Sequence, residues 1–106
     1  MKSKIVLAYC TFPSEAITHQ ICERLVSENT IACANIIGPV KSIYKWKGET
    51  VKELEWVAIM KTSKFKQATL KERIRAIHPY TVPALVFLPV ADGLPEFLNW
   101  VYAQSL

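Results

Sequence analysis

The two most apolar segments of the chain, residues 4–10 and 84–90, constrain its fold more than any other feature. Each has apolar residues on both alternating faces of the strand that it would form. A strand of this kind has to be covered on both sides of its sheet, because apolar surface left in water is unfavourable. The fold therefore needs covering elements on both faces, or a partner that covers one of them.

The segment after the first strand has the periodicity of an amphipathic helix. Ile17, Ile21 and Leu25 recur every four residues and form one apolar stripe. Ser14 precedes this stripe and is a plausible N-cap, because its hydroxyl can accept a hydrogen bond from a free backbone N–H of the first turn. This pattern predicts a helix that packs against the sheet.

A second helix is expected after the third strand, with Thr62 or Ser63 as its N-cap and an apolar stripe over residues 70–77. Its end is expected at His78-Pro79, since a residue that precedes proline is driven out of the helical region. Phe65 does not lie on the apolar stripe. Pro95 suits the first position of a short C-terminal helix.

Three further strand-like segments are residues 31–37, 40–46 and 52–61. Gly38-Pro39 separates the first two and predicts a bend or bulge within one long strand, because proline cannot donate to a β-ladder. The order strand, helix, strand, strand, helix, strand predicts a ferredoxin-like βαββαβ α+β sandwich with an extra C-terminal helix. One layer of helices covers one sheet face, so oligomerisation through the other face is expected.

Composition places the chain among ordinary small globular proteins. Its 106 residues predict a single domain, residues 1–106. The net charge is +4, but the sequence contains no run of like charges of the kind that binds nucleic acid. No segment predicts a signal peptide or a membrane span. The three cysteines have no CxxC spacing, which favours a reducing compartment and predicts a cytoplasmic location.

Five motifs follow one another along essentially the whole chain: CTFPSEA, ACANIIGPVKSIYKWKGE, EWVAIMKTS, HPYTVPALVFLPV and LPEFLNWV. Together they resemble the CutA family of divalent-ion tolerance proteins, and the joint presence of SIYKWKGE and HPYTVP is highly specific. The resemblance implies a non-enzymatic ferredoxin-like subunit that assembles as a PII-like homotrimer. It also implies that the long second and third strands pair with a neighbouring subunit.

The resemblance implies a metal site as well, for copper or another divalent cation. The family's proposed ligands match Cys10 and His78, and a thiolate with an imidazole suits copper or zinc. The third proposed ligand is a glutamate, but this chain has Ala84 at that position, so only weak binding is expected. Cys22 and Cys33 are expected at core-like positions without a functional role.

Other residues are candidates for an intersubunit cleft. The resemblance places Tyr44, Trp46 and Tyr80 there, where they would either contact a small ligand or pack at the interface. Lys61 would neutralise an anion or remain solvated. The alternative function is therefore that of a small-ligand-sensing, PII-like signalling trimer with its ligand in that cleft.

Three other functions of this fold class lack their motifs in this sequence. An RNA-recognition module needs an aromatic motif on its third strand, a heavy-metal chaperone needs CxxC after the first strand, and an acyl-phosphate hydrolase needs an arginine-bearing loop there. A cysteine enzyme remains open, with Cys10 as the nucleophile and His78 as the base.

Overall fold

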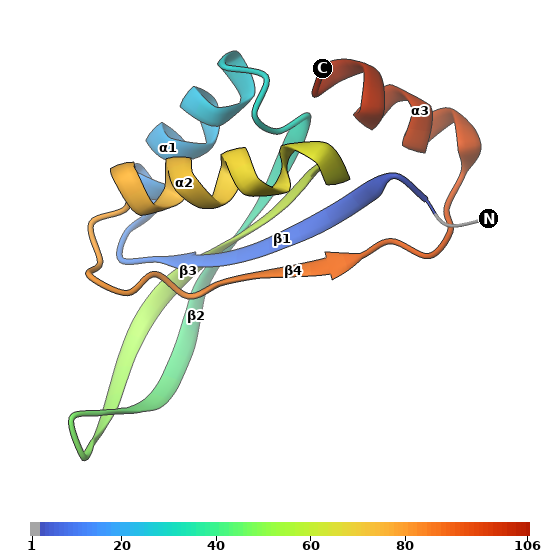
Figure 1. Cartoon of the computed structure of the whole chain (residues 1–106). Helices are drawn as coiled ribbons and strands as arrows, with labels where there is room; N and C mark the ends of the chain where they lie inside the picture. Colours follow the sequence, from blue (N-terminus) through green and yellow to red (C-terminus); the bar gives the residue numbers. More distant parts are fainter. Residues whose placement is uncertain (1–2) are drawn as a thin grey trace.

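The computed structural model describes residues 3–106 as a sheet with helices packed on one of its faces (Figure 1). Its elements, in chain order, are β1 (Ile5–Phe12), α1 (Glu15–Ser27), β2 (Cys33–Trp46), β3 (Glu49–Ser63), the 3-10 turn η1 (Lys64–Lys66), α2 (Gln67–Ile77), β4 (Leu85–Pro89) and α3 (Pro95–Gln104). The four strands are antiparallel in the order β2-β3-β1-β4. This topology confirms the expected ferredoxin-like α+β fold.

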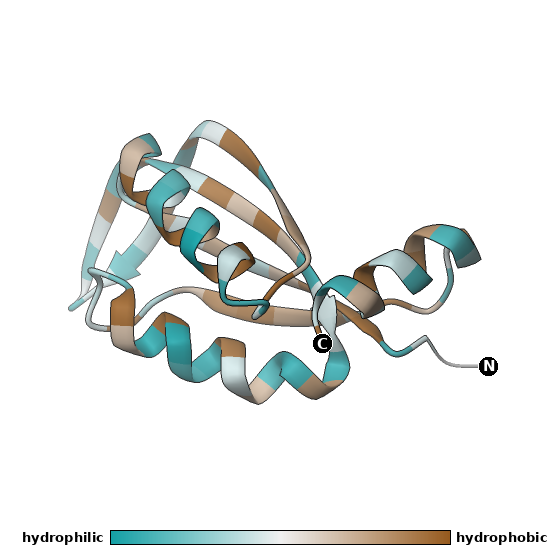
Figure 2. Cartoon of the chain, turned by 90° about the horizontal axis from the view of Figure 1, so that it is seen from above, coloured by the Kyte–Doolittle hydropathy of each residue, from teal (hydrophilic) through white to brown (hydrophobic). Residues whose placement is uncertain are grey.

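The core lies between the sheet and the pair of helices α1 and α2. Successive residues of a strand point to opposite faces, and in β1 every second residue from Ala8 through Cys10 to Phe12 is fully buried. These side chains belong to one apolar cluster with Leu25 of α1 and Leu70 of α2. Figure 2 shows apolar segments along the strands that the helices overlie. Burial of a leucine side chain of this kind stabilises a fold by about 1.5–3 kcal/mol.

The β2–β3 hairpin is longer than the rest of the sheet. Pairing between β1 and β3 runs only as far as Phe12 opposite Trp56, whereas β2 and β3 stay paired to Trp46 opposite Glu49. The outer half of the hairpin therefore projects beyond β1 and β4 as a two-stranded arm (Figure 1).

The expected bend in the second strand lies at the base of this arm. The pairing register shifts between Ile37 and Val40, at Gly38-Pro39. Gly38 lies against the indole of Trp56, and a Cβ at this position would stand only 2.2 Å from the indole Cδ1. A larger residue would have to displace the indole ring, so close backbone approach accounts for the glycine.

Two helix boundaries agree with the sequence. The Ser14 hydroxyl accepts a hydrogen bond of 3.2 Å from the backbone N–H of Ile17, as expected of an N-cap. At the end of α2, His78 has extended backbone angles of φ −75° and ψ 138°, because Pro79 follows it.

The prediction that Thr62 or Ser63 caps the second helix is wrong. Both residues belong to β3, and their hydroxyls make contacts between distant parts of the chain. The Thr62 hydroxyl donates to the carbonyl of Thr30 at 2.7 Å, and the Ser63 and Ser105 hydroxyls lie 2.5 Å apart. The turn η1 then intervenes before α2, which begins without a side-chain cap.

The second face of the sheet carries apolar side chains that remain exposed. On β4, Val86 and Leu88 are 55% and 48% exposed, and they lie opposite Tyr9 and Leu7 of β1. On β2, Ile37 is 49% exposed. We call this face the open face, and its apolar character agrees with the expectation that one helix layer leaves it uncovered.

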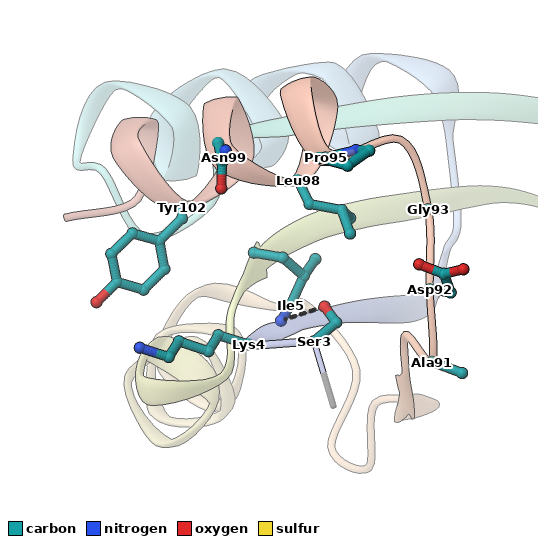
Figure 3. A pocket seen from close by; sticks show the side chains of 10 residues that line it. All are labelled: Ser3, Lys4, Ile5, Ala91, Asp92, Gly93, Pro95, Leu98, Asn99 and Tyr102. Atoms are coloured by element: carbon teal, nitrogen blue, oxygen red, sulfur yellow. Dashed lines mark hydrogen bonds between the residues drawn. The ribbon is translucent and has the colours of Figure 1, made fainter. Parts of the chain in front are cut away.

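The C-terminal helix α3 packs at the end of β1 and β3, where its Leu98 and Tyr102 line a pocket together with Ile5 (Figure 3). Val101 is buried with Ile5 and Ala32 in a second apolar cluster. Phe65, which the sequence left without a role, meets α3 through an edge-to-face contact with Tyr102 at 5.8 Å between ring centroids. No helix within residues 3–106 has the length and hydropathy needed to cross a membrane.

Leu94→Asn is expected to stabilise the fold. Leu94 occupies the N-cap position of α3, makes no side-chain cap and is 72% exposed, so little packing is lost on substitution. An asparagine there can accept a hydrogen bond from the first turn, which is worth about 1 kcal/mol. Chemical denaturation measures the gain, with Leu106→Asn as a matched control at an exposed leucine beyond the helix. Equal effects of the two substitutions would contradict the capping argument.

Candidate functional site

A cavity of about 740 Å³ opens on the open face where the β2–β3 arm leaves the sheet. Its lining includes three of the residues that were predicted to share a cleft: Tyr44 and Trp46 from β2, and Tyr80 from the segment between α2 and β4. The full lining is Tyr9, Thr11, Ser42, Ile43, Tyr44, Trp46, Glu53, Glu55, Pro79, Tyr80, Thr81, Val82 and Ala84. We call this the aromatic cavity.

The aromatic cavity also contains two carboxylates that were not among the predicted site residues. Glu53 and Glu55 are two residues apart on β3, so both project from the open face. The Tyr44 hydroxyl donates to Glu53 Oε1 at 2.5 Å, and the Tyr80 hydroxyl donates to Glu55 Oε2 at 2.8 Å. The signal was present as the alternation ELE, which lies opposite Ser42, Lys41 and Val40 of β2, but polar residues that alternate along a strand usually indicate a solvated face.

These contacts keep both phenols protonated. The hydrogen bond to Glu53 raises the pKa of Tyr44 to about 12. Burial and the hydrogen bond to Glu55 raise the pKa of Tyr80 above its usual range. The cavity therefore holds two carboxylates, each fixed by a neutral phenol donor.

His78 is buried beside this cavity and both of its ring nitrogens are engaged. Its Nε2 donates to the carbonyl of Thr11 at 2.8 Å, and its Nδ1 accepts from the backbone N–H of Tyr80 at 3.0 Å. These partners fix the neutral tautomer that carries its proton on Nε2. The ring also stacks on Phe12 at 4.7 Å between centroids. Burial lowers the pKa of His78 below its usual value, so the ring is neutral at pH 7.

Cys10 lies on the other side of the sheet from the aromatic cavity. Its neighbour Thr11 faces the cavity, so the Cys10 side chain points into the helix-covered core, where it is fully buried. Its thiol lies 3.8 Å from the Thr11 carbonyl as a weak donor. Burial, with the nearby Cys22, raises the pKa of Cys10 to about 12. The Cys10 thiol and the His78 Nε2 both donate to the Thr11 carbonyl, and within residues 3–106 no hydrogen bond joins the thiol to the imidazole ring.

The hydrogen bonds of His78 and the burial of Cys10 oppose metal binding at the expected site. A metal at Cys10 and His78 would have to displace a hydrogen bond of the ring and deprotonate a buried thiol. Ala84 lines the aromatic cavity but supplies no carboxylate. Among residues 3–106 there is no group of three or more His, Cys, Asp or Glu side chains that would hold a metal ion.

The structure places Lys61 outside the aromatic cavity. Its ammonium group donates to the side-chain carbonyl of Asn35, and its backbone pairs with Cys33 across the β2–β3 ladder. Cys33 is half-buried, whereas Cys22 lies in the core as expected. Lys61 is therefore not grouped with the three aromatic residues.

Comparisons with known proteins agree over nearly the whole chain. Residues 6–104 match the family model described as CutA1 divalent ion tolerance protein. The divalent-cation tolerance protein CutA of Thermus thermophilus is 45% identical over 91 residues, which cover 86% of this chain and 88% of that protein. The protein of the same description from Thermotoga maritima is 41% identical, covering 96% of this chain and all of the relative.

Solved structures show the same agreement in three dimensions. A divalent cation tolerance protein from Thermus thermophilus superposes with a TM-score of 0.92 at 40% identity, covering 95% of this chain and 98% of the other. A structure from Archaeoglobus fulgidus, described as a periplasmic divalent cation tolerance protein CutA, gives a TM-score of 0.93 at 33% identity, covering 96% and 99%.

His78 is expected to make the fold sensitive to mild acid. Its folded-state pKa is lowered, so on acidification the unfolded chain takes up this proton first. Stability is therefore full above pH 6.5 and is lost as the pH falls through the folded-state pKa, by roughly 1.4 kcal/mol per unit of pKa difference. His78→Gln should flatten the dependence of unfolding free energy on pH between about pH 7.5 and 5.

The control for this measurement is His19→Gln, since His19 is exposed on α1. It should retain the wild-type dependence of stability on pH. A wild-type profile in His78→Gln would assign the acid sensitivity to other groups.

Proposed function

The chain belongs to the CutA1 family of divalent ion tolerance proteins, and we propose that it acts in the cell's response to divalent cations as a cytoplasmic homotrimer that binds copper or a similar ion weakly. The observation that carries the proposal is the family match over residues 6–104. The cytoplasmic location rests on the unpaired cysteines, although one relative is described as periplasmic.

The open face supports the proposed trimer. Val86, Leu88 and Ile37 are each about half exposed on one side of the sheet, and this arrangement is expensive for an isolated subunit. The projecting β2–β3 arm offers further unpaired strand edge to a neighbour, because β2 lies at the edge of the sheet. A second and third copy of the chain would cover both features.

Val86→Lys is expected to weaken the assembly. A lysine in the middle of a buried apolar interface loses its hydration without gaining a partner, so the trimer should dissociate at higher protein concentration than the wild type. Sedimentation equilibrium or native mass spectrometry measures the change. Val26→Lys is the matched control, because Val26 is an exposed valine on α1. A folded wild-type monomer at micromolar concentration would refute the trimer.

Metal binding at Cys10 and His78 stays a prediction, and their hydrogen bonds explain why it should be weak. Affinity should fall further on acidification, since a thiol and an imidazole must lose their protons to coordinate a metal. Glu53 and Glu55 offer oxygen ligands in the aromatic cavity, but two carboxylates are few for a divalent ion.

Ala84→Glu is expected to tighten binding of divalent cations by about tenfold or more, because it supplies the carboxylate ligand that this chain lacks beside Cys10 and His78. Cys10→Ser and His78→Ala should weaken binding of copper(II) and zinc. Calorimetric titration compares them with Ala103→Glu, which adds the same charge to the exposed face of α3. Equal affinity in all variants would place the metal elsewhere on the surface.

A second candidate function is recognition of a small ligand, as in PII-like signalling trimers. The specific observation is that Tyr44, Trp46 and Tyr80 line one cavity of about 740 Å³, which is within the range of small-molecule sites. If the open face is also the trimer interface, this cavity lies in the cleft between subunits. Ligand binding there would then be coupled to assembly.

A further inference from the structure

The aromatic cavity has a charge opposite to that of the whole protein. The chain carries a net charge of +4, yet the residues that line the cavity include two glutamates and no lysine, arginine or histidine. A concave site lined by charges of one sign favours a ligand of the other sign. The ligand chemistry that fits this lining is therefore cationic.

Glu55 gives independent support for a cation. Only 5% of this residue is exposed, and its sole hydrogen bond among the described side chains comes from the neutral Tyr80 hydroxyl. Within residues 3–106 no basic side chain forms an ion pair with Glu55. Burial of an ionised carboxylate is costly unless a cation partners it, and here the phenol offsets only part of that cost. A bound cation would supply the missing charge.

The walls of the cavity favour an organic cation over a metal ion. Tyr44, Trp46 and Tyr80 line it together with Tyr9, and the faces of such rings attract ammonium groups through cation–π interactions. A hard divalent metal gains nothing from ring faces and needs more oxygen ligands than Glu53 and Glu55 provide. The volume also exceeds what one hydrated metal ion requires, whereas it suits a ligand with an apolar body.

We propose that the aromatic cavity binds a small organic ammonium ion, with its charged nitrogen between Glu53 and Glu55 and its alkyl groups against Trp46, Tyr44 and Tyr80. This inference rests on the proposed ligand-binding role of the same cavity and adds the ligand's chemical class. Tyr44 and Tyr80 hold the two carboxylates in place as hydrogen-bond donors, and their raised pKa values keep them in that neutral form.

The test compares ligands of matched shape and different charge on the full chain. Choline is the cationic probe, 3,3-dimethyl-1-butanol is its uncharged analogue, and 3,3-dimethylbutyrate is an anionic control. Isothermal titration calorimetry should show choline binding at least about tenfold more tightly than the neutral analogue, and no binding of 3,3-dimethylbutyrate. Raising the ionic strength should weaken choline binding, because part of the attraction is electrostatic.

Matched variants locate the site. Glu55→Gln should reduce choline affinity about tenfold or more, while Glu23→Gln, which removes the same charge from an exposed position of α1, should leave it unchanged. Glu53→Gln gives a second reading if Glu55→Gln fails to fold. Trp46→Leu should reduce affinity several-fold with little effect on charge.

The outcomes separate this inference from the proposed role of the cavity. Equal binding of choline and its neutral analogue, lost in Trp46→Leu, would leave a ligand-binding cavity but overturn its cation preference. Choline binding that is indifferent to Glu53→Gln, Glu55→Gln and Trp46→Leu would overturn this site. Absence of choline binding would overturn the inference of an ammonium ligand without bearing on uncharged ligands of other shapes.

Discussion

Alternation of side chains along β1 and β3 is the constraint from which both the core and the site follow. A strand presents successive residues to opposite faces, so the residue next to a core position has to face the other side of the sheet. In β1 this rule places Cys10 in the helix-covered core and Thr11 in the aromatic cavity. In β3 it aligns Glu53 with Glu55 on the open face. A one-residue shift of register would exchange the two sets, and burial of the core prevents such a shift.

His78 contacts both the core and the aromatic cavity, since its ring stacks on Phe12 and accepts a hydrogen bond from the backbone of Tyr80. Its helix ends because Pro79 follows it, and its ring then reaches the Thr11 carbonyl on one side and the Tyr80 backbone N–H on the other. Tyr80 in turn donates its hydroxyl to Glu55. The histidine that the sequence suggested as a metal ligand therefore has a structural task in this subunit. It positions a phenol that fixes one of the two carboxylates of the cavity.

Much of the fold could be predicted because local rules decide it. The apolar strands, the Ser14 cap and the helix end before Pro79 depend on neighbouring residues, and each agrees with the structure. The cap expected at Thr62 or Ser63 is absent because the hydroxyl groups of both residues form hydrogen bonds with residues that are distant in the sequence. Thr62 and Ser63 bond to Thr30 and Ser105, and no local pattern reveals such distant partners.

The site was predicted only in part, for a related reason. The positions of Tyr44, Trp46 and Tyr80 near recognisable motifs predicted a shared site, and all three side chains line the aromatic cavity. Glu53 and Glu55 instead had the pattern of a solvated strand face, so their role depended on knowing which side of the sheet curves into a cavity. Lys61 shares the open face but bonds to Asn35, so proximity to a motif was an insufficient guide.

Local charge, and not the net charge, decides which ligand such a cavity accepts. The lysines and arginines that give the chain its net charge of +4 are spread over the surface, where salt screens their field over roughly 8–10 Å. Glu53 and Glu55 would contact a bound ligand directly in a partly desolvated cavity. The effective dielectric constant is lower there, so the electrostatic attraction between each carboxylate and a cation is stronger. A basic protein can therefore hold a cation-selective site, provided that its carboxylates are fixed in position. Here the phenol donors meet that condition, because Tyr44 holds Glu53 and Tyr80 holds Glu55 by hydrogen bonds that add no positive charge.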